Sequence, residues 1–259
     1  MANDSRRGRN EQTSRFEHTV SHELRTPLTS ATEFIGILLE GLAGPLAAEQ
    51  REYLALAKQS CDQMKRCLDD LLEATRAETG KLQVKLVRTA LDRVLDTAMA
   101  SMNPFIAANG VRLMRGARQA GQVQVLMDEN RIMQVLLNLL SNARRYTPTG
   151  GEVRIDVRHD PNGTDFLFVS VSNTGPPVKA EDLERIFERG YQGSQNDHSG
   201  EAGIGLGLYI SRQIVALHGG KIWAENVPSL GPKFTFSLKK ASQPSKASLQ
   251  TVFAKSMVS

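Results

Sequence analysis

The chain has 259 residues, of which 40% are hydrophobic and 23% charged, and its formal net charge is +4. No apolar run approaches the ~20 residues that a membrane-spanning helix needs, so we expect a cytoplasmic protein whose own chain makes no membrane contact. Aromatic residues make up only 5%, which disfavours a surface that stacks nucleic-acid bases.

Two helices are expected in the N-terminal third. Residues 1–15 are polar and predict a linker, and a helical pattern then runs from about Phe16 to Glu40. Glycines and a proline in 41–45 break this pattern, and a second helix ends near Gly80, a plausible C-cap. The apolar residues of both helices step by threes and fours, the period of a bundle seam. They are Val20, Leu24, Pro27, Ala31, Phe34 and Leu38, and then Leu54, Ala57, Cys61, Met64, Leu68 and Leu71.

Two helices with one apolar seam each cannot bury those seams alone. We therefore expect residues 16–79 to form an antiparallel helical hairpin, and two subunits to complete a four-helix bundle as a homodimer. Cys61 and Cys67 fall on different sides of the second helix, so they are not expected to pair with each other.

Residues 80–240 change to a mixed pattern that predicts an α+β fold in which helices pack on a sheet. Asp128 is expected to cap a helix over 129–146, and 241–259 are expected to form a flexible tail. The other expected helices cover 91–108, 179–188 and a segment that starts within 203–208. The expected strands are LQVKLV (82–87), VRLM (111–114), VQVLM (123–127), EVRIDVRH (152–159), DFLFVSVSN (165–173), KIWAEN (221–226) and KFTFSL (233–238).

The first candidate site is His22 in SHELRTPL. A neutral imidazole is a nucleophile that can take a phosphoryl group, and the adjacent Glu23 can accept its proton or orient it. Pro27 allows the helix to bend beside the ring, and Thr26, one turn on, can position a water. The plain alternative is a solvated helix histidine. A zinc site with His18 is disfavoured because the H-E-x-x-H arrangement needs a histidine where Thr26 stands.

The second candidate is the polar face of NLLSNARRYTP, where Asn138 and Asn142 lie one helical turn apart. An amide oxygen can ligate Mg²⁺ without adding charge, and Mg²⁺ keeps few protein ligands when phosphates supply the rest. Arg145 can hold a phosphate oxygen, and Tyr146 follows it. The alternative is an ordinary solvent-exposed side of a helix.

Two glycine-containing turns are the remaining candidates. Gly203, Gly205 and Gly207 stand at a loop-to-helix junction, where backbone N–H groups can approach an anion. The polar stretch before them has the composition of a mobile lid. Asn173 ends a strand and Gly175 turns the chain, which is either a plain turn or a polar side chain that reads a base edge on a pocket floor.

In their order, these motifs resemble those of the sensor histidine kinases of two-component signalling. SHELRTPL resembles the phosphoacceptor box and NLLSNARRYTP the asparagine box. VSNTGPP, LERIFERGYQG and GIGLGLYISRQIVALHGG resemble the first glycine, phenylalanine and second glycine boxes, and GPKFTFSL the last strand. The resemblance, from about Phe16 to Lys239, implies a dimerisation and phosphotransfer hairpin. It also implies a two-layer α/β sandwich of the Bergerat (GHKL) ATP-binding type.

The resemblance implies a protein-histidine kinase that uses ATP and Mg²⁺, phosphorylates itself and passes the group to an aspartate of a response regulator. The chain would then be cytoplasmic, or the cytosolic part of a larger or membrane-bound sensor. In the hairpin, the resemblance implies that His22 is the phosphorylated residue, Glu23 its acid–base partner, and Thr26 a residue that acts in dephosphorylation of the regulator. On the asparagine box, it implies that Asn142 is the Mg²⁺ ligand, that Asn138 and Arg145 lie near the phosphates, and that Tyr146 lies near the nucleotide. It also assigns Asn173 and Gly175 to the first glycine box, and Gly203, Gly205 and Gly207 to the lid hinge.

The sequence departs from the family pattern at four positions. Asn173 stands where an aspartate usually accepts a hydrogen bond from the adenine amino group, and its amide oxygen can still accept one. Pro177 replaces a glycine, and Lys233 replaces a small hydroxyl residue. Gly190 replaces an aromatic residue, which predicts a weaker lid anchor. Two other functions stay open: a catalytically weak dimeric docking or phosphatase module, and an ATPase of the same fold without histidine transfer.

Overall fold

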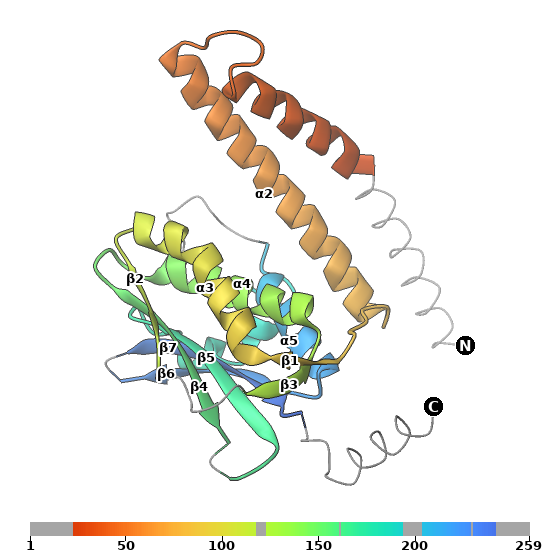
Figure 1. The fold of residues 1–259 in the computed structure, drawn as a ribbon, viewed down its shortest axis with the longest axis vertical. Helices are drawn as coiled ribbons and strands as arrows, with labels where there is room; N and C mark the ends of the chain where they lie inside the picture. Colours follow the sequence, from red (N-terminus) through yellow and green to blue (C-terminus); the bar gives the residue numbers. More distant parts are fainter. Residues whose placement is uncertain (1–22, 118–122, 161, 194–203, 229, 242–259) are drawn as a thin grey trace, which may run out of the picture. The chain divides into compact units, whose positions relative to one another are not determined.

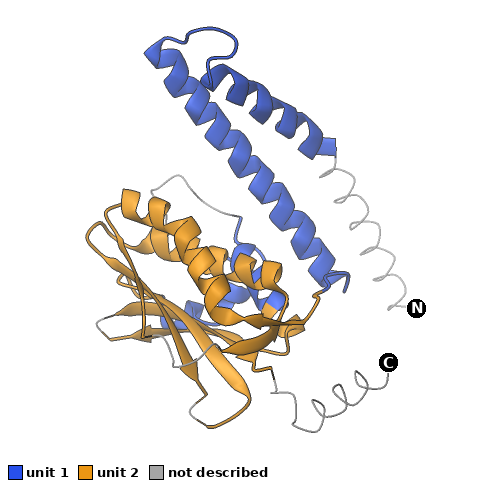
Figure 2. Ribbon diagram, in the orientation of Figure 1, with its two compact units in different colours: residues 1–83, 178–214 blue, residues 84–177, 215–259 orange. Residues whose placement is uncertain are grey.

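The computed structural model describes residues 23–117, 123–160, 162–193, 204–228 and 230–241 (Figure 1). His22, Gly203, the expected linker and almost all of the expected tail lie outside the described residues. The chain divides into two compact units (Figure 2). Unit 1 comprises residues 1–83 and 178–214, and unit 2 comprises 84–177 and 215–259.

Unit 1 contains the antiparallel hairpin. A helix over 23–39 lies beside α2 (Ala48–Glu78), as Figure 1 shows. The two are joined by an ion pair between Arg25 and Asp69 at 2.5 Å, and by a hydrogen bond that the Arg51 guanidinium donates to the carbonyl of Leu39 at 2.9 Å. The turn between them places Gly44 at φ 114°, a conformation that favours glycine. Over the described residues 23–79, the expected hairpin and its break are confirmed.

The C-terminus of α2 is closed by backbone hydrogen bonds around Gly80. This glycine has φ 67° and follows the C-cap residue Thr79. Its N–H donates to the carbonyl of Ala77 at 3.2 Å, and the N–H of Lys81 donates to the carbonyl of Arg76 at 2.8 Å. This pair of bonds is the Schellman arrangement, so the expected helix end is confirmed, with Gly80 one residue beyond the cap.

The apolar seam of the hairpin is largely uncovered within one chain. No residue of the helix 23–39 is buried, and in α2 only Leu72, Ala74 and Thr75 are buried. Phe34 is 67% exposed and Met64 49% exposed. Cys61 and Cys67 are both free thiols, as expected. An exposed apolar row of this kind is typical of a surface that another protein covers.

One acid on α2 makes the stability of the hairpin depend on pH. Burial, followed by the nearby carboxylates of Glu73 and Asp69, raises the pKa of Asp70 from 3.8 to about 6. The folded state therefore binds the proton of Asp70 more tightly than the unfolded state does. This contribution to the free energy of unfolding is fully present below pH 3.8 and is lost as the pH rises through about 6. Above pH 6 the buried charge is a cost.

We expect Asp70→Asn to raise the melting temperature at pH 7.5 by roughly 2–4 °C, since it removes that charge. The gain should shrink between pH 6 and pH 4 and vanish below it, as measured by thermal melting followed by circular dichroism. Glu52→Gln, at an exposed position of the same helix, is the control and should change little at any pH. A gain that is equal at pH 4 and pH 7.5 would contradict the assignment.

Unit 2 is built on a five-stranded sheet with the order β2-β4-β5-β7-β6, in which only β2 and β4 are parallel. A two-stranded antiparallel sheet pairs β1 with β3. The strands are β1 (Val87–Ala90), β2 (Arg112–Arg115), β3 (Gln124–Met127), β4 (Glu152–His159), β5 (Phe166–Asn173), β6 (Ile222–Val227) and β7 (Gly231–Lys239).

Two helices, α3 (Leu91–Ala108) and α4 (Glu129–Tyr146), lie over one face of the large sheet (Figure 1). The division between the units falls within a third helix, α5 (Gly207–Leu217). A mixed sheet with helices on one face confirms the expected two-layer α/β sandwich. No helix in the described parts of the chain combines the length and the hydropathy that a bilayer span requires.

The core of unit 2 lies between α4 and the sheet because a 3.6-residue and a 2-residue apolar pattern meet there. Val171 on β5 pairs with Ile155 on β4 and with Phe234 on β7, so all three lie on one face of the sheet. All three are buried. The buried residues of α4 are Ile132, Val135, Leu136, Leu139, Leu140 and Ala143.

The expected strand at 82–87 is wrong. The ladder of β1 starts only at Val87, which pairs with Met127, the last residue of β3. Asp128 then begins the turn into α4, so residues before Val87 have no strand to pair with. Instead, the N–H of Lys85 donates to the Asp128 side chain at 2.9 Å. Of the three alternating apolar residues, Leu82 is buried without belonging to a strand, whereas Leu86 is 46% exposed.

Other expected elements hold with small changes. The helical piece at 179–188 consists of two 3₁₀ turns, η1 (Ala180–Asp182) and η2 (Arg185–Phe187). The other helices and strands lie within about two residues of their predicted bounds, except that the predicted start of the first helix near Phe16 lies outside the described residues.

Candidate functional site

The N-terminus of α4 is fixed by Asp128. Its carboxylate accepts hydrogen bonds from the N–H groups of Arg131 at 3.2 Å and Lys85 at 2.9 Å, which confirms the expected N-cap. Burial opposes the charge, but these backbone hydrogen bonds outweigh it and lower the pKa of Asp128. The Asp128 N–H in turn donates to Nε2 of His218 at 3.0 Å. The helix that carries the two asparagines is therefore anchored within unit 2.

The polar face of α4 carries the predicted phosphate and metal residues. Asn138, Asn142 and Arg145 are half-buried and spaced by four and three residues, so they share one side of the helix. Tyr146 follows at the helix end and is 39% exposed. The Arg145 guanidinium lies 5.5 Å from the Tyr146 ring centroid, a cation–π contact. The structure thus brings these four predicted residues together on α4.

Asn173 lies at the end of β5 with only 3% of its surface exposed. Its amide nitrogen is buried and has no hydrogen-bond partner among the described residues. A buried donor without a partner costs about 1–3 kcal/mol, so such groups are rare unless a ligand or a water completes them. The side chain therefore keeps a hydrogen-bonding group that a ligand or a water could complete, and its place on a pocket floor stays a prediction.

Gly175 connects Asn173 to the end of α4. A Cβ at Gly175 would lie 2.2 Å from the Tyr146 carbonyl oxygen and 2.5 Å from the Asn173 amide nitrogen, so only glycine fits. At Gly231, where φ is 82°, a Cβ would lie 2.5 Å from the Asn173 carbonyl oxygen. The turn after β5 is thus enclosed between α4 and the start of β7.

These residues fit a nucleotide with a metal ion. The unpartnered amide of Asn173 suits the hydrogen-bonding edge of a base, and Arg145 suits a phosphate. Among the described residues, no group of three or more histidine, cysteine or acidic side chains could hold a metal ion. An ion in this region would therefore depend on phosphate oxygens plus a neutral ligand such as Asn142, which is the coordination that suits Mg²⁺.

In unit 1, the segment from Tyr191 to Gly205 is closed at its base. The Gly190 N–H donates to the Gly205 carbonyl at 3.1 Å. Gly205 has φ 71°, and a Cβ there would lie 2.6 Å from the Tyr191 carbonyl oxygen. Gly207 is the first residue of α5. Of Gly205 and Gly207, the two predicted hinge glycines that the structure describes, Gly205 is therefore the one whose backbone demands glycine.

Tyr191 anchors this segment where Gly190 lacks an aromatic ring. Its hydroxyl donates a hydrogen bond to the carboxylate of Asp182, which is 4% exposed. The Arg185 guanidinium lies 4.6 Å from the centroid of its ring. The hydrogen bond to Asp182 and burial raise the pKa of Tyr191, so the phenol keeps its proton. These contacts support the base of the segment despite the missing aromatic residue.

A further cluster in unit 1 was not predicted. The Arg189 guanidinium contacts both carboxylate oxygens of Glu78, at 3.0 and 3.1 Å, and so joins the segment after η2 to the last residue of α2. Burial raises the pKa of Tyr209 on α5, and the Glu78 carboxylate adds to this shift. The signal in the sequence was only a pair of opposite charges 111 residues apart, which no local pattern connects.

The structure describes part of the predicted phosphoacceptor motif. Glu23 and Thr26 are exposed in the first turn of the helix 23–39. His22 directly precedes that turn and lies outside the described residues, so its role stays a prediction. The residues on α4 and β5 belong to unit 2, whereas Gly205 and Gly207 belong to unit 1.

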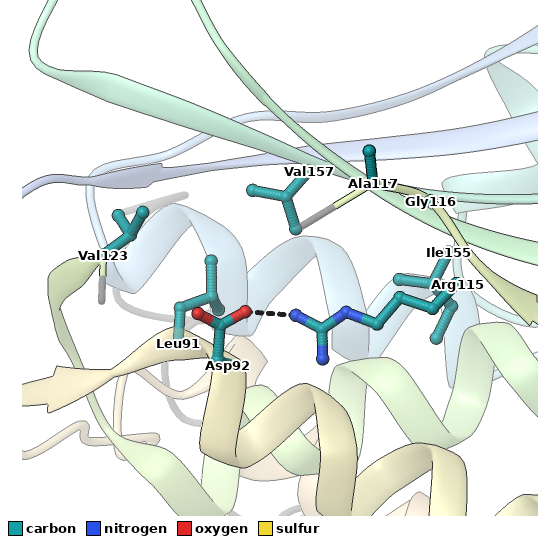
Figure 3. Close-up of a pocket in the computed structure, with 8 residues that line it drawn as sticks. All are labelled: Leu91, Asp92, Arg115, Gly116, Ala117, Val123, Ile155 and Val157. Atoms are coloured by element: carbon teal, nitrogen blue, oxygen red, sulfur yellow. Dashed lines mark hydrogen bonds and ion pairs between the residues drawn. The ribbon is translucent and has the colours of Figure 1, made fainter. Parts of the chain in front are cut away.

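A pocket elsewhere in unit 2 contains none of the predicted residues (Figure 3). Arg115, at the end of β2, makes ion pairs with Asp92 and Asp96 of α3. The two acids neutralise the arginine, so the cluster ties α3 to the sheet and offers no free positive charge to a ligand. The pocket is lined by Leu91, Asp92, Arg115, Gly116, Ala117, Val123, Ile155 and Val157.

Two family models match the chain. Residues 12–80 match the His Kinase A (phospho-acceptor) domain. Residues 127–242 match the histidine kinase-, DNA gyrase B-, and HSP90-like ATPase. The two matched segments follow each other in the order that the motifs predict.

Curated relatives and a solved structure agree with these matches. The adaptive-response sensory kinase SasA of Synechococcus sp. (strain JA-2-3B'a(2-13)) is 35% identical over 219 residues, 84% of this chain and 56% of that protein. The sensor histidine kinase WalK of Bacillus subtilis (strain 168) is 31% identical over 229 residues, 86% of this chain and 36% of that protein. Full-length ShkA, crystallised with AMPPNP, is 28% identical with a TM-score of 0.72 and covers 90% of this chain.

The chain spans about half the length of the first of these relatives and 48% of ShkA. The helical hairpin followed by the α/β sandwich, both family models and the named relatives lead to one assignment. This chain belongs to the sensor histidine kinases of two-component signalling systems.

Proposed function

We propose that this chain is a protein-histidine kinase that binds ATP, phosphorylates its own His22 and passes the phosphoryl group to an aspartate of a response regulator. The observation that carries the proposal is the polar face of α4, together with a buried amide at Asn173 that lies near the last residue of α4, on an ATPase fold that follows a phosphoacceptor hairpin. A cytoplasmic location is part of this proposal, because the reaction needs ATP and a response regulator.

In the proposed reaction, a ring nitrogen of His22 attacks the terminal phosphorus of ATP. An N–P bond forms, the P–O bond to ADP breaks, and Glu23 accepts the imidazole proton. Arg145 and Asn138 would hold phosphate oxygens, and the amide oxygen of Asn142 would hold Mg²⁺, which would offset the phosphate charge. Most of the catalysis is positioning and electrostatics, because the side chains perform little covalent work.

The hairpin supports the dimer and the partner in this proposal. Its exposed seam, with Phe34 and Met64 uncovered, would be buried against the hairpin of a second subunit in a four-helix bundle. The response regulator would dock near His22, where Thr26 would position a water that removes the phosphoryl group from the regulator. The match of residues 12–80 to the phospho-acceptor domain favours histidine transfer over a simple ATPase.

We expect incubation of the protein with Mg²⁺ and γ-labelled ATP to give a phosphoprotein whose label is lost in acid and retained in alkali. A phosphorus–nitrogen bond to imidazole hydrolyses in acid, whereas phosphoserine and phosphothreonine survive it. The same incubation with EDTA should give no label, because phosphate charge is then not offset. Acid-stable label would contradict histidine transfer, and ATP binding without label would favour the catalytically weak docking module.

A further inference from the structure

Asn173 combines a fixed position with an incomplete set of hydrogen bonds. Its backbone continues the ladder of β5, opposite Val153. Its side chain is 3% exposed, and its amide nitrogen has no partner among the described residues. A Cβ at Gly175 would lie 2.5 Å from the amide nitrogen of Asn173, and a Cβ at Gly231 would lie 2.5 Å from its backbone carbonyl oxygen, so both positions need glycine. The backbone of Asn173 is therefore fixed, while its side-chain amide nitrogen has no hydrogen-bond partner among the described residues.

The chemistry of an amide differs from that of a carboxylate at this position. A carboxylate only accepts hydrogen bonds, whereas an amide carries a donor and an acceptor side by side. The amide torsion is also two-fold, so a half-turn exchanges the oxygen and the nitrogen at almost the same positions. One asparagine can thus match an edge that offers donor then acceptor, or acceptor then donor.

Purine bases offer both kinds of edge. Adenine presents its 6-amino donor beside the N1 acceptor. Hypoxanthine, which has nearly the same size, presents a 6-oxo acceptor beside the N1–H donor. An amide can form two hydrogen bonds with either base by turning over, but a carboxylate would set its negative oxygen against the 6-oxo group of hypoxanthine.

We propose that Asn173 makes this nucleotide site tolerant of the 6-position, so that 6-oxopurine nucleoside triphosphates bind nearly as well as ATP. The inference rests on the proposed function only in placing a nucleotide base at Asn173. Selectivity between 6-amino and 6-oxo purines in this chain is then set by this one side chain, and an aspartate there would restore it.

The test is a calorimetric titration of the whole chain with Mg-ATP and Mg-ITP, which measures binding without any phosphoryl transfer. We expect the two dissociation constants to agree within about fivefold, and Asn173→Asp to favour ATP by at least about 20-fold, since it loses a donor and gains a repulsion. Asn109→Asp, which adds the same charge at an exposed helix end, is the control and should keep the parent ratio.

Each outcome decides between the alternatives. Rejection of ITP by more than about 20-fold in the parent protein would overturn the inference, even if Asn173→Asp did not fold. An unchanged ratio in a folded Asn173→Asp protein would overturn it as well, as would the absence of binding of both nucleotides. ATP binding without labelling of His22 would contradict the proposed function and leave this inference standing. Labelling of His22 together with rejection of ITP would overturn this inference alone.

Discussion

Replacing His22 with glutamine is expected to reduce phosphorylation of the chain by ATP to background, by at least about 10³-fold. Glutamine keeps a polar side chain of similar reach, but its amide nitrogen is not a nucleophile, so the N–P bond cannot form. Nucleotide binding should be unchanged, because the residues proposed to hold ATP lie on α4 and β5. The measurement is labelling with γ-labelled ATP alongside a nucleotide titration.

His18→Gln is the matched control for this experiment. His18 stands four residues before His22 in the sequence and carries the same ring, but it lies outside the SHELRTPL motif. We expect this variant to label at the parent rate. Undiminished acid-sensitive labelling of His22→Gln, or loss of label in His18→Gln alone, would contradict the assignment of the phosphorylated residue.

Replacing Asn142 with alanine is expected to lower the rate of autophosphorylation by about 10²–10³-fold, because the metal and the terminal phosphate lose their fixed position. The fold should persist. Asn142 is half-buried, while its neighbours Leu139 and Ala143 carry the packing of α4, and alanine is the better helix former. The initial rate of labelling, thermal melting and the mass of the dimer in solution measure these three quantities.

Two further variants separate a ligand role from a packing role. Ser141→Ala changes the exposed neighbour on α4 and should label at the parent rate. Asn142→Asp keeps an oxygen ligand for Mg²⁺ and should recover part of the activity that alanine removes. If Asn142→Ala instead became monomeric or melted early, the asparagine face would be structural, and the proposed metal ligand would be wrong.

Local pattern predicted the elements of unit 2 well, for reasons that particular residues show. In β4 and β5, Val153, Ile155, Val169 and Val171 are buried at alternate positions because one face of the sheet packs under α4, although β5 also buries polar residues near its end. Asp128 identified the start of α4 because a short acidic side chain satisfies the free N–H groups of a helix terminus. The strand predicted over residues 82–87 was wrong because alternating apolar residues indicate burial on one side, but they do not supply a partner strand.

The sequence by itself determined the family, the order of the two domains and the residue types of the candidate site, because motif spacing and apolar period are written along the chain. Only the tertiary structure decided which of these residues meet. The contact of Gly175 with Tyr146 and Asn173, the Tyr191–Asp182 hydrogen bond and the Glu78–Arg189 ion pair each depend on the path of the backbone. That path follows from the burial of the whole apolar core, so no local stretch of residues encodes it.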